Sequence, residues 1–231
     1  MTKANPAYSS ADVRSLFAGP VAAAELRQPG DVDLLLPAEA QCLGRAVAQR
    51  RQEFAAGRLC ARRALAEFGV VDFALRAAAD RQPVWPAGFI GSITHTAGFC
   101  AAAVGERRHF LGLGLDCETI GEVTQPLWPR IFGPEEAAWV DSQPALGRAA
   151  AATMIFAAKE AFYKCQYPVV GERLDFHDVR IEPLDWRSAR GFFAIHGSRH
   201  LAIVALTQPP MLGTYRIVAA IVAVGVTLKP R

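Results

Sequence analysis

Residues 111–118 read LGLGLDCE, an apolar run that ends in two carboxylates on either side of a cysteine. If the run is a β-strand, its side chains alternate between the two faces, so Asp116 and Glu118 point to the same face. Neighbouring carboxylates repel each other unless a cation lies between them, and Mg²⁺ commonly takes one or two carboxylates together with water and substrate phosphates. The stretch predicts a divalent cation site, with a solvated strand end as the alternative.

A second charged group lies in the strongly helical pattern of residues 149–167, within the sequence IFAAKEAFYK. Glu160 and Lys164 are four residues apart and share one helix face, and such pairs commonly form surface salt bridges. Here the surrounding helix is apolar and rich in aromatic residues. Charged groups embedded in such a helix, including Lys159, favour a role in binding a partner.

Upstream of the strand, one long helix is predicted over residues 37–69, with Pro37 at its start and Gly69 at its end. Three arginines lie along one edge of its apolar face: Arg51, Arg58 and Arg62. Guanidinium groups suit phosphate oxygens, so this edge could hold a polyanion; alternatively, the arginines extend from a half-buried helix to solvent. Short strands are then predicted at 89–93, 99–104 and 111–116.

The chain after the strand repeats this organisation. Four prolines around Glu135 and Glu136 indicate short helices and turns over residues 126–147, before the helix of 149–167. Strands are predicted after that helix at 176–182, 192–196, 200–206 and 215–224. The sequence therefore predicts an α+β fold of two similar halves, residues 1–115 and 116–231.

A turn of small residues, GSITHT at 91–96, presents Ser92, Thr94 and His95 after an apolar strand. These groups could bind phosphate, and Arg81 in the turn ADRQP could add a positive charge. The nucleophile motif GxSxG is absent, which argues against a serine hydrolase. The P-loop signature and a complete GxGxxG are absent too, so a polyphosphate would have to be held by arginine, lysine and metal.

Composition excludes several classes. The chain has 231 residues, 52% of them hydrophobic, and a net charge of +3, which is too small to argue for nucleic acid. Five cysteines without a CxxC pair suggest neither a disulfide framework nor a zinc site. The N-terminus lacks the apolar region of a secretory signal, and the apolar tail of 217–228 is too short to span a bilayer. We expect a cytoplasmic protein without membrane attachment.

The motifs GSITH, GLDCE and FAAKEAFYK, in this order, resemble those of the 4′-phosphopantetheinyl transferase superfamily, in the branch of siderophore-synthase and actinobacterial carrier-protein activators. The resemblance extends upstream to RRQEFAAGRLCAR and RQPVWP and downstream to ERLDFHDV, and so covers about residues 37–182. It implies two pseudo-symmetric α+β halves with the active site between them. It also implies transfer of phosphopantetheine from coenzyme A to a serine of an apo acyl or peptidyl carrier protein, with release of 3′,5′-ADP.

The resemblance assigns roles to individual positions. Mg²⁺, or Mn²⁺ in its place, would be held by Asp116, Glu118, Glu160 and the backbone carbonyl of Cys117. Glu160 would also act as general base, and Lys164 would assist catalysis by neutralising phosphate charge. Coenzyme A would be bound by Arg51, Arg58, Arg81, Gln82, Pro83, Thr94, His95, Asp116, Lys159, Lys164 and Leu174. Ala157 departs from the family pattern, which often has Ser or Cys there, and this affects the expected helix packing rather than the chemistry.

Two rival functions use parts of the same residue set. A non-catalytic binder of coenzyme A or polyphosphate would need the arginines but not three metal-binding carboxylates. A nucleic-acid-binding module would need aromatic residues interleaved with the arginines for base stacking, and these are missing, so we expect no nucleic-acid partner. We expect a monomer, because two similar halves can supply the symmetry that other enzymes obtain from a dimer.

Overall fold

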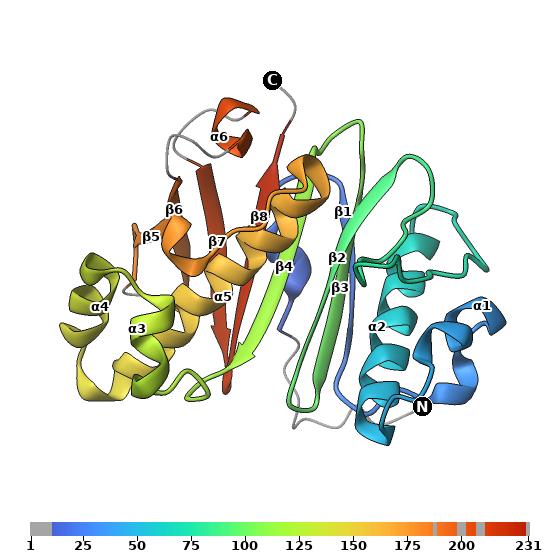
Figure 1. The fold of residues 1–231 in the computed structure, drawn as a ribbon, viewed down its shortest axis with the longest axis horizontal. Helices are drawn as coiled ribbons and strands as arrows, with labels where there is room; N and C mark the ends of the chain where they lie inside the picture. The colour runs from blue at the N-terminus through green and yellow to red at the C-terminus, as the bar shows by residue number, and fades with distance from the viewer. Residues whose placement is uncertain (1–10, 187–188, 198–201, 207–210, 230–231) are drawn as a thin grey trace, which may run out of the picture.

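The computed structural model describes residues 11–186, 189–197, 202–206 and 211–229. In these ranges the chain forms two antiparallel sheets, each with one long helix against it, so the predicted α+β class is confirmed (Figure 1). One sheet has three strands and the other has five. A pseudo-symmetric relation between the two units stays a prediction.

The smaller sheet has the strand order β1 (Val21–Leu26), β3 (Phe99–Glu106) and β2 (Phe89–Thr96). The central strand β3 is buried along nearly its whole length, and its residues 101–103 are all alanine. Helix α2 (Ala48–Ala66) covers one face of this sheet and also contributes small residues, among them Ala56, Cys60 and Ala61. Small side chains on both partners let the helix approach the sheet closely.

The larger sheet has the order β4 (Gly112–Thr119), β8 (Ile221–Leu228), β7 (Met211–Val218), β6 (Arg190–Gly197) and β5 (Val179–Pro183). Helix α5 (Ala145–Val170) crosses the face of this sheet over β4 and β8 (Figure 1). The glycines of LGLGL explain the close approach. A Cβ atom on Gly114 would lie 1.9 Å from the carbonyl oxygen of Ala161, and one on Gly112 would lie 2.4 Å from that of Cys165.

Strands β2 and β4 belong to different sheets and meet through side-chain hydroxyls. Ser92 Oγ donates to the Leu115 carbonyl at 3.3 Å, and Thr94 Oγ1 accepts the Cys117 N–H at 2.9 Å. Thr96 Oγ1 accepts the Thr119 N–H at 3.2 Å. We call these three contacts the hydroxyl seam: Ser92 with Leu115, Thr94 with Cys117, and Thr96 with Thr119. It holds the two sheets at a fixed register.

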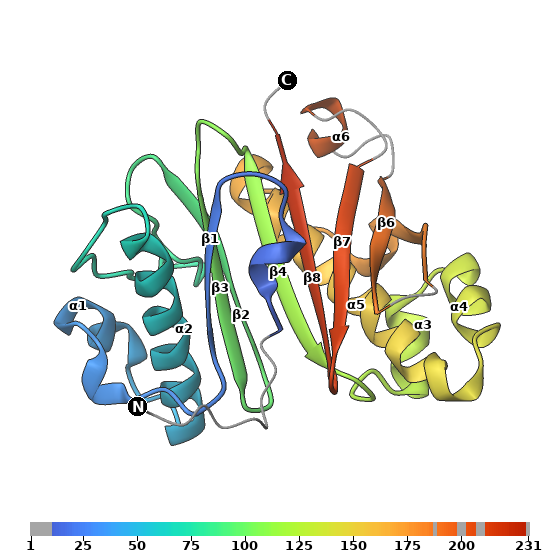
Figure 2. The same ribbon diagram turned by 180° about the vertical axis from the view of Figure 1, so that it is seen from behind.

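Shorter elements surround this framework: η1 (Val13–Leu16), η2 (Val32–Leu34), α1 (Pro37–Ala40), η3 (Gln41–Leu43), η4 (Gln125–Leu127), α3 (Trp128–Ile131), α4 (Pro134–Asp141), η5 (Phe176–Asp178) and α6 (Ala202–Leu206). The first of them lies over the opposite side of the sheets, against β8 and β1 (Figure 2). Glu25 on β1 accepts the backbone N–H groups of Ala11 and Val13, which fixes this segment. Across the described residues, no helix is both long and apolar enough to cross a membrane.

The helix predicted over 149–167 is confirmed as α5, but the helix predicted over 37–69 is wrong. It divides into α1, η3 and α2, because Gly44 adopts a non-helical backbone with φ 50° and residues 44–47 connect the pieces. Strand β1 was not predicted, since its run VAAAEL has no clear alternation of apolar and polar residues. The boundary predicted between residues 115 and 116 falls within β4 and stays a prediction.

The strand pattern of the second half also needs correction. The single strand predicted at 215–224 is a hairpin, in which β7 ends at Val218 and β8 begins at Ile221, with Ala219 at φ 53° in the turn. Residues 202–206 form α6 rather than a strand, and residues 200 and 201 of that prediction lie outside the described residues. The strand predicted at 176–182 begins only at Val179, after η5.

The contact of β4 with α5 makes a testable prediction. Gly114→Ala should destabilise the protein by about 1–3 kcal/mol or more, because the new methyl group collides with helix backbone and forces the strand and the helix apart. Gly147→Ala is the matched control: it lies in α5, no described atom beyond its chain neighbours and the surrounding helix backbone lies within 4 Å of the added Cβ, and the change should be neutral or stabilise by up to about 1 kcal/mol. Urea unfolding measures both, and equal midpoints for the two variants would contradict the proposed close contact.

Candidate active site at the junction of the two sheets

A partly buried ion pair lies beside the hydroxyl seam. Asp116 on β4 is 2% exposed, and its Oδ1 accepts a hydrogen bond from Lys164 Nζ on α5 at 2.6 Å. The same oxygen accepts the hydroxyl of Thr94 at 3.2 Å. Burial by itself would lower the pKa of Lys164, but the charge and hydrogen bond of Asp116, with the charge of Glu160, raise it above its usual value. Lys164 therefore stays protonated.

Two further carboxylates share this electrostatic environment. Burial, followed by the negative charge of Asp116, raises the pKa of Glu118 to about 8, against the opposing effect of Lys164. Burial also raises the pKa of Glu160, and there too Lys164 opposes the shift while Asp116 adds to it. The two sequence motifs are thus brought together: β4 supplies Asp116 and Glu118, and α5 supplies Glu160 and Lys164.

The donor set suits a hard divalent cation. Oδ2 of Asp116 is buried and has no hydrogen-bond partner among the described residues, so one carboxylate oxygen is available to a ligand. Three neighbouring carboxylates repel one another when ionised, and a cation between them favours the ionised forms. Oxygen atoms are the ligands that Mg²⁺ prefers. Within the described part of the chain, no three His, Cys, Asp or Glu side chains already lie at metal-binding spacing. The carboxylates fit Mg²⁺ chemically, and the metal site stays a prediction.

The Cys117 thiol points away from these carboxylates. It is fully buried in an apolar cluster with Leu115 and Phe99, and burial raises its pKa well above the usual value. A buried neutral thiol in apolar surroundings is a poor metal ligand. Its backbone N–H bonds to Thr94 in the hydroxyl seam, so the backbone rather than the sulfur of Cys117 lies at the junction.

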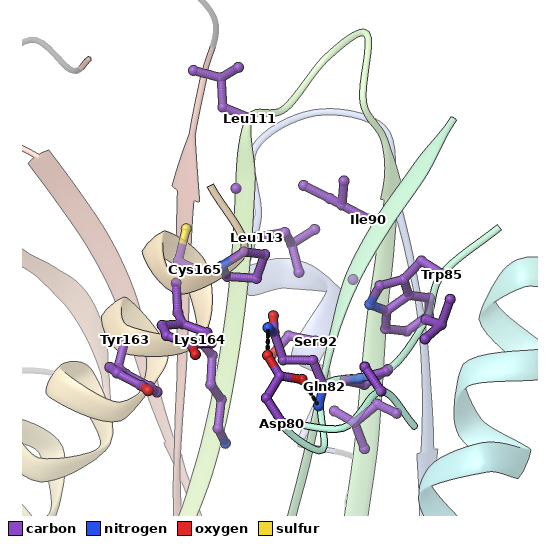
Figure 3. A pocket seen from close by; sticks show the side chains of 18 of the residues that line it. Asp80, Gln82, Trp85, Ile90, Ser92, Leu111, Leu113, Tyr163, Lys164 and Cys165 are labelled. Carbon is purple, nitrogen blue, oxygen red and sulfur yellow. Dashed lines mark hydrogen bonds between the residues drawn. The ribbon is translucent and has the colours of Figure 1, made fainter. Parts of the chain in front are cut away.

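A cavity of about 660 Å³ opens beside Lys164 (Figure 3). Tyr163 and Lys164 line it from α5, and Ser92 lines it from β2. Across from α5, the connection before β2 contributes Gln82 and Pro83, two residues predicted to bind coenzyme A. Gln82 is held in place by Asp80, which accepts its side-chain amide at 2.6 Å and its backbone N–H at 3.2 Å. Gln82, Pro83 and Lys164 thus line one cavity, and their binding of coenzyme A stays a prediction.

Other predicted residues line two neighbouring cavities. Glu160 and Leu174 share a cavity of about 340 Å³. His95 and Glu118 share one of about 520 Å³. The predicted site residues therefore line three cavities, of which the two beside Lys164 and Glu160 share Tyr163.

Two arginines of α2, Arg58 and Arg62, are held by contacts within the protein. Arg58 is 6% exposed, donates from Nε to the Leu75 carbonyl at 2.7 Å and stacks 3.9 Å over the Phe54 ring. Burial lowers its pKa to about 10, opposed by nearby Glu39. Arg62 pairs with the fully buried Glu39, so it fastens α1 to α2 rather than extending into the site.

His95 has a partner that the sequence did not suggest. Arg50 donates from Nη1 to His95 Nε2 at 3.0 Å, and Glu53 lies 3.9 Å from the same nitrogen. Burial, with the charge of Arg50, lowers the pKa of His95, against the effect of Glu53. The signal that could have found Arg50 and Glu53 is their i,i+3 spacing on the helix that carries Arg51.

The remaining predicted residues are placed as follows. Arg51 is partly exposed near the start of α2. Arg81 is exposed at a left-handed φ of 72°, and the residues that line the large cavity include its neighbour Gln82. Thr94 is 2% exposed and is already bonded to Asp116 and Cys117. Phosphate contacts by these residues stay predictions.

Lys159 lies in a different environment from Lys164. Its Nζ is buried among four oxygen atoms, and its nearest charge is Glu136 at 2.8 Å. Burial lowers the pKa of Lys159, while Glu136 opposes that shift. The predicted contact of Lys159 with a phosphate would require these bonds to break, and it stays a prediction. Glu136, noted in the sequence only as part of an acidic pair, is a structural residue that the sequence analysis missed.

Comparison with known proteins gives two family matches that together span most of the chain. Residues 38–105 match the model of the 4′-phosphopantetheinyl transferase N-terminal domain. Residues 112–219 match the model of the 4′-phosphopantetheinyl transferase superfamily. The matches adjoin near the start of β4, where the two sheets meet.

Three curated relatives carry the same name. The chain is 35% identical to the 4′-phosphopantetheinyl transferase Npt of Nocardia iowensis, over 72% of this chain and 73% of that protein. It is 36% identical to Svp of Streptomyces mobaraensis, over 65% of this chain and 61% of that protein. It is 37% identical to PptT of Mycobacterium tuberculosis, over 63% of this chain and 64% of that protein. The chain belongs to the 4′-phosphopantetheinyl transferase superfamily.

Proposed function

We propose that this protein transfers the 4′-phosphopantetheine group from coenzyme A to a serine hydroxyl of an apo acyl or peptidyl carrier protein, releasing 3′,5′-ADP. The observation that carries the proposal is the group of three carboxylates around Lys164 at the junction of the sheets. The relatives named as transferases support it, because both family matches reach this junction.

Glu160 is the proposed general base. It lines a cavity and forms no hydrogen bond to another described residue that would hold its carboxylate away from a substrate. Burial raises its pKa, and a carboxylate with a higher pKa accepts a proton more readily. Its role is to take the proton of the carrier serine as the serine oxygen attacks the β-phosphorus of coenzyme A. The bond from that phosphorus to the bridging diphosphate oxygen then breaks.

Lys164 is the proposed electrostatic partner of the departing 3′,5′-ADP. Its ammonium group stays protonated, and its side chain is 30% exposed and lines the large cavity. A fixed positive charge placed where negative charge develops lowers the barrier to phosphoryl transfer. Asp116, Glu118, Glu160 and the Cys117 carbonyl would hold Mg²⁺, which when bound neutralises the diphosphate.

The arrangement supports an assignment for the rest of coenzyme A. Arg51 and His95, with Arg50 beside them, offer positive or hydrogen-bonding groups for the 3′-phosphate. Gln82 and Pro83 line the large cavity on the side where adenine would lie, with Arg81 next to them. Leu174 offers an apolar surface beside Glu160 for the pantetheine arm. Arg58 and Thr94 would support these groups from the positions where their present bonds hold them.

The test follows the carrier and the leaving group together. We expect the protein, incubated with coenzyme A, Mg²⁺ and a panel of apo carrier domains, to add phosphopantetheine to a carrier and to release an equal amount of 3′,5′-ADP. Glu160→Gln should reduce the transfer rate by about 100-fold or more, because an amide cannot accept the serine proton. Mass spectrometry of the carrier and chromatography of the nucleotide provide the two readouts.

A carrier with Ser→Ala at its modified residue is the matched control and should gain no mass. Tight binding of coenzyme A without modification of any carrier in a broad panel, and without release of 3′,5′-ADP, would instead support the non-catalytic coenzyme A binder. Native transfer rates for Glu160→Gln would remove Glu160 as the base.

The raised pKa of Glu118 predicts a dependence of stability on pH. An acid whose pKa is about 8 in the folded protein and about 4.5 when unfolded binds its proton more tightly in the folded state. The contribution of Glu118 to the free energy of unfolding is therefore fully present below about pH 4.5 and is lost as the pH rises towards 8. Without divalent cations, Tm should fall from pH 5 to pH 8, and Glu118→Gln should make that fall smaller. Scanning calorimetry measures it; an unchanged pH profile in the variant would show that Glu118 is not a buried, coupled carboxylate.

A further inference from the structure

The Nζ atom of Lys159 is surrounded by four oxygen acceptors, one each from α3, α4, η5 and β5. It donates to Oε2 of Glu136 on α4 at 2.8 Å and to the Ile131 carbonyl at the end of α3 at 2.8 Å. It also lies 2.6 Å from the Phe176 carbonyl and 3.0 Å from that of Val179. An ammonium group has three N–H donors, so these acceptors account for all of them.

Glu136 completes the network. Its Oε1 accepts the backbone N–H of Ile181 at 2.7 Å, and its Oε2 accepts that of Gly133 at 2.8 Å. Both charged side chains are 1% exposed. A buried pair with every donor and acceptor satisfied fixes the segments that it joins, because moving one of them would leave a charge unpaired in a medium of low polarity.

Two of these elements, η5 and β5, follow each other in sequence and face the proposed base, Glu160. Glu160 lines the cavity of about 340 Å³ from α5, and Leu174, Phe176 and Val179 line it as well. We call residues 174–179 the facing wall. The carbonyls of Phe176 and Val179 bind Lys159, the residue next to Glu160 in sequence, so one stretch of α5 both carries the carboxylate and anchors the wall across from it.

We infer that Lys159 is a positioning residue and not a ligand of the coenzyme A phosphates. Together with Glu136 it fixes the facing wall opposite Glu160, and the wall in turn sets the path of the substrate arm. The inference rests on the proposed transferase function for its kinetic readout. Releasing Nζ to meet a phosphate would break four contacts and leave the Glu136 carboxylate buried without its cation. Burial already lowers the pKa of Lys159, in line with an enclosed group.

The test uses the double variant Lys159→Met with Glu136→Gln, which removes both buried charges together and so avoids leaving one unpaired. Leu65→Ala is the matched control, because Leu65 is fully buried in the smaller sheet's core and its truncation lowers stability far from the wall. We measure kcat and KM for coenzyme A, the Kd for coenzyme A by calorimetry, and amide hydrogen exchange of residues 131–136 and 174–181, all below the unfolding transition of each variant.

The double variant should lose tenfold or more in kcat while its Kd for coenzyme A stays within twofold of native. Amide exchange should become faster at Gly133, at Ile181 and along the facing wall, and Leu65→Ala should keep native kcat and native exchange there. Lys159→Arg, a second variant, should also lose kcat, because a guanidinium is too large and too differently shaped for the four acceptors.

A phosphate ligand would behave differently. The double variant would then bind coenzyme A about ten- to a hundredfold more weakly, with native exchange in the facing wall, and Lys159→Arg would keep native kcat. The inference is overturned by weaker binding with native exchange in the double variant, by native kcat in Lys159→Arg, or by native kcat in the double variant. If the native protein modifies no carrier, the proposed function fails, but the exchange and calorimetry still decide the role of Lys159.

Discussion

The carboxylate of Asp116 is the point on which the two units of this protein converge. It lies on an edge strand of the larger sheet, accepts a hydroxyl from the smaller sheet through Thr94, and accepts the ammonium group of Lys164 from α5. Three elements therefore depend on one buried carboxylate for their relative position. Because Lys164 pairs directly only with Asp116, ionising Glu118 and Glu160 as well would leave negative charge that a divalent cation could balance.

Close packing makes this convergence possible. The glycines before Asp116 bring the β4 backbone against α5, and the hydroxyl seam joins β4 to β2 without a main-chain ladder. The first and last hydroxyl residues of the seam line cavities: Ser92 lines the one beside Lys164, and Thr96 lines the one beside His95. The same features that fix the fold thus create the spaces in which a ligand can bind.

The sequence predicted the central motifs well because their chemistry is local. Alternation along LGLGLDCE placed Asp116 and Glu118 correctly on one strand face, and helical spacing placed Glu160 near Lys164. The sequence did not separate Lys159 from Lys164, and both were predicted to bind coenzyme A. At 3.6 residues per turn, residues five apart are rotated by about 140°, so Lys159 and Lys164 reach different surroundings. Only the fold shows that one meets Asp116 and the other meets Glu136.

Other differences have similar causes. The break at Gly44 and the hairpin at Ala219 depend on single residues at positive φ, which apolar periodicity does not reveal. Strand β1 is specified by its pairing with β3 rather than by its own pattern, and Arg50 reaches His95 only after α2 is placed on the smaller sheet. Long-range pairing and side-chain direction decided these features.

The most direct test of the account is a calorimetric titration of coenzyme A into the native protein and into Asp116→Asn, each with and without Mg²⁺. The account predicts that Mg²⁺ tightens coenzyme A binding to the native protein by tenfold or more, because the cation links the carboxylates to the diphosphate. It also predicts that this gain disappears in Asp116→Asn, which keeps the size of the side chain but loses its charge. An equal gain from Mg²⁺ in both proteins would show that Asp116 does not hold the metal and would contradict the proposed site.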